Sequence, residues 1–113
     1  MGDFVTVGRA SEVKRGQRKC FWVEGIRVLV LNIDGEYYAI DDSCPHRECP
    51  LDDAVLNGKV IVCPCHAAQF NVETGEVLVH PVGFPPTVPI PVHQVKVDGV
   101  NLQVALSTEI DSV

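Results

Sequence analysis

Residues 28–40 read Val-Leu-Val-Leu-Asn-Ile-Asp-Gly-Glu-Tyr-Tyr-Ala-Ile, which is two apolar runs on either side of Asp34-Gly35. Asp-Gly accepts the positive φ angles of the tight turns that join antiparallel strands, so this stretch predicts a β-hairpin. Similar turn pairs separate other short apolar runs along the chain: Glu24-Gly25, Asn57-Gly58, Thr74-Gly75 and Asp98-Gly99. Turns this frequent leave no room for a long helix, and only residues 10–13 have space for one helical turn. We therefore expect an all-β fold built from hairpins.

The size and composition indicate one globular domain over residues 1–113. Hydrophobic residues make up 46% of the 113 residues and charged residues 21%, as in ordinary folded domains. No apolar run approaches the roughly 18 residues that a membrane span needs. The first residues lack the basic stretch and apolar run of an export signal. We therefore expect a cytoplasmic protein without a membrane anchor.

The charge is negative overall and unevenly placed. The formal net charge is −6, which argues against nucleic acid as a partner. Residues 1–33 carry six basic and three acidic side chains, whereas residues 34–113 carry three basic and twelve acidic ones. Such a negative surface is able to steer a basic partner protein. It is equally consistent with a surface that only keeps the protein soluble.

Two short segments hold the residues best suited to metal chemistry, namely Cys44-Pro45-His46 and Cys63-Pro64-Cys65-His66. Each segment offers one thiolate and one imidazole, and sixteen residues separate His46 from Cys63. Five cysteines in a chain without an export signal favour metal binding or redox chemistry over a disulfide framework. Thiolates suit iron–sulfur clusters, and imidazole suits iron as well as zinc. A structural zinc site is the alternative, but such sites usually begin with a Cys-x-x-Cys pair, which these segments lack.

The spacing of these ligands resembles the signature of Rieske ferredoxins, and so do several flanking residues. The matching flanks are Pro45, Arg47, Pro50, Leu51, Gly58, Pro64, Phe70, Thr74, Gly75 and Glu76. The resemblance covers roughly residues 3–105 and implies a Rieske fold of stacked antiparallel β-sheets, with a cluster-binding subdomain at about residues 43–86. It also implies one [2Fe–2S] cluster, with Cys44 and Cys63 on one iron and His46 and His66 on the other. The surface around the two histidines would then exchange electrons.

Two further cysteines, Cys49 and Cys65, lie in the same two loops. Rieske proteins of respiratory cytochrome bc complexes have cysteines at both positions, and there they form a disulfide that clamps the loops together. The resemblance therefore implies a Cys49–Cys65 disulfide. Two reduced thiols remain the alternative in a reducing cytoplasm.

Two positions depart from the respiratory pattern. Respiratory Rieske proteins carry a Ser and a Tyr whose hydroxyls donate hydrogen bonds toward sulfur and raise the potential, whereas this chain has Ala68 and Phe70 there. Neither side chain is a donor. Rieske potentials span roughly −150 to +300 mV, and we expect a value below the upper end.

Three functions compete at this stage. The resemblance favours a soluble one-electron carrier, not an enzyme, that works as a monomer between a reductase and a terminal acceptor such as an oxygenase. The second is a small Rieske subunit of a larger oxidoreductase of the nitrite or arsenite type. The third is a structural metal module without redox activity. Outside the two segments, we expect Cys20 to be a buried core residue, His80 to be a hydrogen-bonded structural residue, and His93 to lie in a strand without a partner motif.

Overall fold

A computed structural model describes residues 3–45, 49–65, 67–83 and 85–107 of the chain. The described residues form two antiparallel β-sheets and one short 3-10 turn, η1 (Ala10–Glu12), so the predicted all-β class is confirmed. The larger sheet has the order β1-β10-β9-β4-β3-β2 and the smaller sheet the order β5-β6-β7-β8. The strands of the larger sheet are β1 (Val5–Arg9), β2 (Arg18–Val23), β3 (Ile26–Ile33), β4 (Glu36–Asp41), β9 (Val92–Asp98) and β10 (Asn101–Ala105). Those of the smaller sheet are β5 (Val55–Asn57), β6 (Val60–Val62), β7 (Gln69–Asn71) and β8 (Val77–Val79).

Tight turns set the register of the larger sheet. Asp34 and Gly35 have φ angles of 56° and 92°, and the strands on either side pair from Ile33 opposite Glu36 to Val28 opposite Asp41. Glu24 and Gly25, with φ angles of 51° and 84°, join β2 to β3 in the same way. Positive φ at both central residues is the conformation that matches the twist of paired strands. The predicted hairpins are therefore confirmed, including those at residues 57–58, 74–75 and 98–99.

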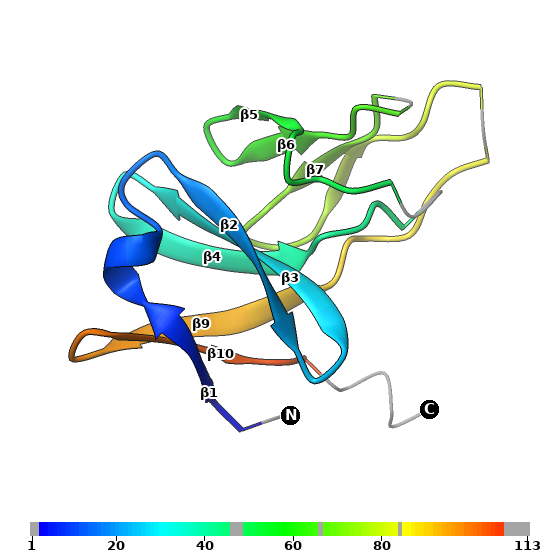
Figure 1. The fold of residues 1–113 in the computed structure, drawn as a ribbon. Helices are drawn as coiled ribbons and strands as arrows, with labels where there is room; N and C mark the ends of the chain where they lie inside the picture. Colours follow the sequence, from blue (N-terminus) through cyan, green and yellow to red (C-terminus); the bar gives the residue numbers. More distant parts are fainter. Residues whose placement is uncertain (1–2, 46–48, 66, 84, 108–113) are drawn as a thin grey trace.

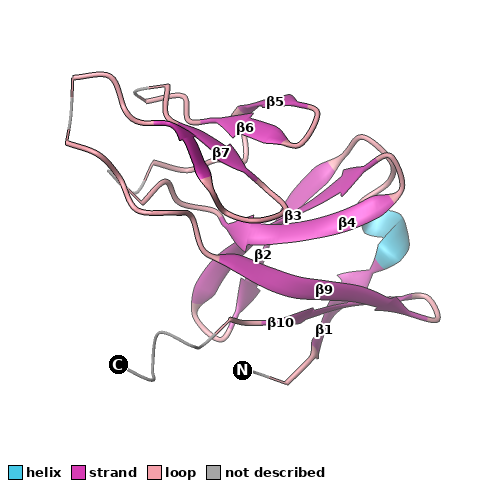
Figure 2. Cartoon of the chain, turned by 180° about the vertical axis from the view of Figure 1, so that it is seen from behind, coloured by secondary structure: helices cyan, strands magenta, loops and turns pink. Residues whose placement is uncertain are grey.

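The smaller sheet leaves the larger one between two neighbouring strands. Strands β4 and β9 pair directly, with Ala39 opposite His93 and Ile40 opposite Val92. The whole of β5 to β8 lies between these two strands in the sequence, and it stands above the larger sheet in Figure 1. The loops that connect the two sheets gather at one end of the molecule (Figures 1 and 2).

Strand β3 is buried on both faces and supports two apolar cores. Leu29 and Leu31 point into the inter-sheet core, whereas Val28 and Val30 point into a base core on the opposite face. The other fully or nearly fully buried members of the inter-sheet core are Ile40, Cys44, Leu51, Ala54, Ile61, Cys63, Ala68, Phe70, Val72 and Ile90. Those of the base core are Val13, Phe21, Val23, Ala39, Leu102, Val104 and Leu106. A strand that is covered on both faces carries a continuous apolar run, as residues 28–31 do.

No helix within the described ranges has the length and apolar character that a membrane crossing requires.

Candidate metal centre

Two loops bring the predicted cysteine ligands into the same core. Cys44 follows β4 and is 0% exposed, and Cys63 follows β6 and is 1% exposed. Both side chains belong to the inter-sheet core, together with Leu51, Ala68 and Phe70. Because both loops pack on the same apolar core, the thiols of Cys44 and Cys63 are shielded from water.

The first loop, residues 42–51, is closed at its base by hydrogen bonds. The Cys44 N–H donates to the Cys49 carbonyl over 2.8 Å. The Leu51 N–H donates to Oδ1 of Asp42 over 2.8 Å, and Leu51 itself is fully buried. These bonds fix the positions where the loop leaves and rejoins the core.

The second loop is a tight turn that follows β6. The Cys63 N–H donates to the Ala68 carbonyl over 2.8 Å, and the Ala67 N–H donates to the Cys63 carbonyl over 3.0 Å. Ala67 has a φ angle of +63°, which few residues other than glycine adopt. The turn directs Cys63 into the core and leaves Pro64 and Cys65 exposed.

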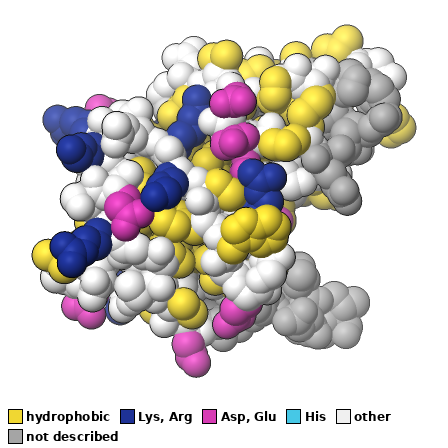
Figure 3. Space-filling view, viewed as in Figure 1, with side chains coloured by type: hydrophobic (Ala, Val, Ile, Leu, Met, Phe, Trp, Pro, Cys, Tyr) yellow, Lys and Arg dark blue, Asp and Glu magenta, His cyan; other side chains and the backbone are white. Residues whose placement is uncertain are grey.

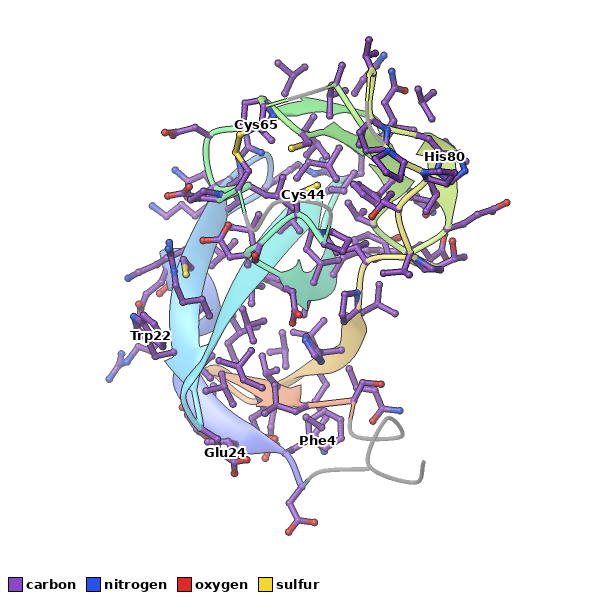
Figure 4. The ribbon with its side chains drawn as sticks, turned by 90° about the vertical axis from the view of Figure 1, so that its right-hand side faces the viewer. Phe4, Trp22, Glu24, Cys44, Cys65 and His80 are labelled. Atoms are coloured by element: carbon purple, nitrogen blue, oxygen red, sulfur yellow. A yellow bond between two sulfur atoms is a disulfide. The ribbon has the colours of Figure 1, made fainter. Side chains whose placement is uncertain are left out.

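A disulfide joins the two loops, as the resemblance implied. Cys49 and Cys65 are bonded through their sulfur atoms, and their Cα atoms lie 6.5 Å apart. In Figure 4 the bond at Cys65 lies at the same end of the molecule as Cys44. The Sγ atoms of Cys49, Cys63 and Cys65 all lie within 4.8 Å of one another. While the disulfide is closed, only Cys63 of these three can offer a thiolate to a metal.

The structure places part of the predicted ligand set. Cys44 and Cys63 stay outside the disulfide, and both are buried in the inter-sheet core. Two buried thiols on two clamped loops fit a metal group that needs soft ligands and protection from water. The predicted partners His46 and His66 lie outside the described residues.

An apolar groove of about 510 Å³ adjoins the second loop. Its walls include Cys63 and Cys65 together with the aliphatic side chains of Val55, Val62 and Val82. Val55 and Val82 are 66% and 69% exposed. Apolar side chains thus surround the cysteine loop on its outer side as well as in the core. Lys and Arg side chains, by contrast, gather mostly in the left half of the face shown in Figure 3.

The structure also tests the predictions for Cys20, His80 and His93. The prediction for Cys20 is wrong, because this residue is only partly buried and accepts a hydrogen bond from Arg27 Nε over 3.4 Å. Strand β2 is the last strand of its sheet and buries Phe21 and Val23 on one face, which leaves Cys20 and Trp22 on the other. Partial burial raises the pKa of the Cys20 thiol, and the Arg27 contact opposes that rise.

The two remaining histidines outside the motif both have hydrogen-bond partners. His80 Nδ1 accepts from the Thr87 N–H over 3.2 Å, so this histidine is hydrogen-bonded, as predicted. Nε2 of His93 lies 2.6 Å from Oδ1 of Asp41, and its Nδ1 accepts from the Ser107 N–H over 3.0 Å. His93 therefore links β9 to β4 and to Ser107, which follows β10. No motif in the sequence predicts these contacts.

Comparison with known proteins identifies the family. The model of the Rieske [2Fe-2S] domain matches residues 3–104. The chain belongs to this family. As a Rieske protein it carries a [2Fe–2S] cluster, which confirms the predicted cofactor and decides against the structural zinc site.

Similar proteins are ferredoxins of dioxygenase systems. The ferredoxin component of the naphthalene 1,2-dioxygenase system of Pseudomonas putida is 33% identical over 97 residues, which is 86% of this chain and 89% of that protein. The ferredoxin of carbazole 1,9a-dioxygenase from Nocardioides aromaticivorans IC177 superposes with a TM-score of 0.76 at 33% identity, covering 92% of this chain and 98% of the other. A chain in the complex of reduced oxygenase and oxidised ferredoxin in carbazole 1,9a-dioxygenase superposes with a TM-score of 0.76 at 32% identity, covering 94% and 97%. This Rieske protein is accordingly a ferredoxin and an electron carrier, as predicted.

Proposed function

We propose that this Rieske ferredoxin carries single electrons from a reductase to the terminal oxygenase of an aromatic dioxygenase system. One observation carries the proposal: the likeness to the naphthalene dioxygenase ferredoxin component spans 86% of this chain and 89% of that protein. The similar carbazole dioxygenase chain comes from a complex of an oxygenase with its ferredoxin, which supports an oxygenase as the acceptor here.

The proposed ligands are Cys44 and Cys63 for one iron and His46 and His66 for the other. The burial of both cysteines in one core, outside the disulfide, supports the first pair. The second pair rests on the spacing of the sequence motif. Two neutral imidazoles in place of two thiolates make the bound group less negative and raise its potential. We also propose that residues 1–113 are one domain, in which about residues 43–86 form the cluster-binding part.

The residues of the chain would hold the group and control access to it. Leu51, Ala68 and Phe70 exclude water from the cysteine side, since all three are fully buried. The Cys49–Cys65 bond holds the two loops together, which limits the rearrangement that accompanies each electron transfer. We propose that electrons enter and leave at the face around His46 and His66.

A second candidate is a small subunit of a larger oxidoreductase, and the respiratory-type Cys49–Cys65 pair supports it. The two functions differ in the assembly that each requires. We expect a monomer in the cytoplasm of the source cells, as a free carrier requires. Native mass measurement and fractionation of the source cells test this expectation, and a stable large complex would instead favour the subunit.

The carrier function is tested by electron delivery in a single turnover. The ferredoxin is first reduced with one electron and is then mixed, without oxygen, with an oxidised terminal oxygenase purified from the source cells. We expect the visible spectrum of the ferredoxin to return to its oxidised form as the oxygenase becomes reduced. Reoxidation that is no faster than with an unrelated oxygenase would contradict the proposal.

A further inference from the structure

Asp42 is a buried carboxylate at the start of the first cluster loop. Its side chain is 0% exposed, and it lies two residues before Cys44. Two residues of chain span at most about 7 Å, so the Cα atoms of Asp42 and of this proposed ligand lie within about that distance. A buried charge costs free energy unless it is paired and fully hydrogen-bonded. The burial of a carboxylate at residue 42 therefore needs an explanation other than packing.

The carboxylate joins the two ends of the loop. Oδ1 of Asp42 accepts the Leu51 N–H over 2.8 Å, so the residue before the loop is bonded to the residue at its end. The Asp42 N–H donates to the carbonyl of Arg27 over 2.9 Å, which anchors the same residue to strand β3. Opening the loop at this point would leave the Leu51 amide and a carboxylate oxygen without partners in the core.

Arg27 supplies the opposite charge from outside the loop. Its Nη2 donates to Oδ2 of Asp42 over 2.7 Å, and its Nε donates to Cys20 Sγ over 3.4 Å. The Arg27 side chain is 37% exposed, whereas that of Asp42 is fully enclosed. Water therefore screens the positive charge better than the negative one. The pair is therefore an unequal dipole whose buried end is negative.

We propose that Asp42 is a positioning residue for the iron–sulfur cluster. Asp42 holds the first ligand loop closed. Together with Arg27, it also sets the reduction potential of the cluster through the dipole of the ion pair. The proposal rests on the assignment of Cys44 as a cluster ligand made above. A buried negative charge near the cluster opposes the uptake of an electron and lowers the potential. Arg27 acts in the opposite sense but more weakly. If the pair only joined strands, its two halves would not shift the potential in opposite directions.

The test is the reduction potential of the intact holoprotein in a matched set of variants. Asp42→Asn keeps an oxygen that can accept the Leu51 N–H but removes the charge, so the potential should rise. Arg27→Gln leaves the carboxylate without its counter-charge, so the potential should fall. The double variant should lie between the two single variants. If Arg27→Gln does not fold, the comparison of the double variant with Asp42→Asn gives the same information, and the potential should be lower in the double variant.

The exposed ion pair of Lys59 and Glu73 provides the control. These side chains lie 3.0 Å apart on the smaller sheet and are 46% and 52% exposed, so Lys59→Gln and Glu73→Gln should shift the potential much less. Shifts of Asp42→Asn and Arg27→Gln that share one sign, or that do not exceed the control shifts, would overturn the electrostatic role.

Two further measurements separate loop closure from the ligand assignment. Amide exchange at Leu51 should become fast in Asp42→Ala and stay slow in Asp42→Asn, and slow exchange in both variants would overturn the role in loop closure. Cys44→Ala should lose the iron–sulfur absorption. If Cys44→Ala retains the cluster, the ligand assignment fails, whereas the Leu51 exchange rates still report on the loop.

Discussion

Cys49 and Cys65 lie on different loops, sixteen residues apart in the sequence, and their sulfur atoms form a bond beside the buried thiol of Cys63. The bond joins the loop that carries Cys44 to the loop that carries Cys63. Each loop also has internal hydrogen bonds, but the disulfide is the covalent link between them. The disulfide therefore restrains the distance between these two loops, which must stay fixed if Cys44 and Cys63 bind the same metal group.

Removal of this bond should loosen the centre. Closing a loop of this length stabilises a protein by about 3 kcal/mol in the chain-entropy model. The double variant Cys49→Ala/Cys65→Ala should therefore lose its visible iron–sulfur absorption at a lower temperature than the wild type. Cys20→Ala is the control, because Cys20 lies on β2 outside both loops. Equal bleaching temperatures in the double variant and the wild type would show that the disulfide does not hold the loops.

New hydroxyl groups at positions 68 and 70 should raise the potential. Ala68 and Phe70 are fully buried in the core that contains Cys44 and Cys63, so Ala68→Ser and Phe70→Tyr would place donors near sulfur. A hydrogen bond that is about 1 kcal/mol stronger to the reduced form raises a one-electron potential by about 40 mV.

Phe21→Tyr is the control for these variants, because Phe21 is also buried but belongs to the base core. Spectroelectrochemical titration compares the three variants with the wild type. A potential that is unchanged in Phe70→Tyr would mean that this position does not face the cluster.

Two glycines with positive φ should respond differently to alanine. Gly75 has a φ angle of +83°, and an added Cβ would lie 2.3 Å from the carbonyl oxygen of Ile90. Gly58 has a φ angle of +62° and open space around it. Gly58→Ala should cost about 1–2 kcal/mol of unfolding free energy for the left-handed conformation alone. Gly75→Ala should cost that amount plus about 1–3 kcal/mol for the steric conflict.

Denaturant unfolding of both glycine variants measures this difference. Gly75 also donates to the Asn71 carbonyl and accepts from the Ile90 N–H, so the backbone is not free to move away. Equal losses in the two variants would contradict the close packing of residues 75 and 90.

The Cys20 thiol should react slowly with iodoacetamide at neutral pH. Burial raises the pKa of this thiol above its ordinary value, and only the thiolate reacts. The labelling rate should climb as pH rises beyond the usual cysteine range near 8.5. By the same linkage, the contribution of Cys20 to stability is complete below its ordinary pKa and is lost as pH rises through the raised value. Mass spectrometry of the native protein follows the label, and rapid labelling at pH 7 would contradict the shift.

The sequence allowed prediction of the features that depend on local chemistry. Asp34-Gly35 and Glu24-Gly25 predicted their hairpins because few dipeptides adopt two positive φ angles. The Cys49–Cys65 bond followed from family resemblance, since spacing alone does not select a partner for a cysteine.

Side-chain contacts between residues far apart in the sequence were not predicted. Asp42 meets Arg27 from fifteen residues away, and His93 meets Asp41 from fifty-two. The first contact lies one step beyond the β3–β4 register that the Asp34-Gly35 turn sets, whereas the second requires the pairing of β4 with β9, which no short motif encodes. The prediction for Cys20 was wrong because its strand, β2, is an edge strand that is buried on one face only. The apolar run at residues 20–23 does not show in the sequence which face is exposed.

The most direct test of the account is a redox titration of the anaerobically purified protein, followed by its visible absorption. A Rieske centre in this chain predicts a coloured protein that takes up one electron per chain, at a potential below the upper end of the range of roughly −150 to +300 mV. Histidine ligands further predict that this potential falls as pH rises through the alkaline range, because electron and proton uptake are then coupled. A colourless protein, or a coloured one whose potential is flat across that range, would contradict the proposed centre with Cys44, His46, Cys63 and His66 as ligands.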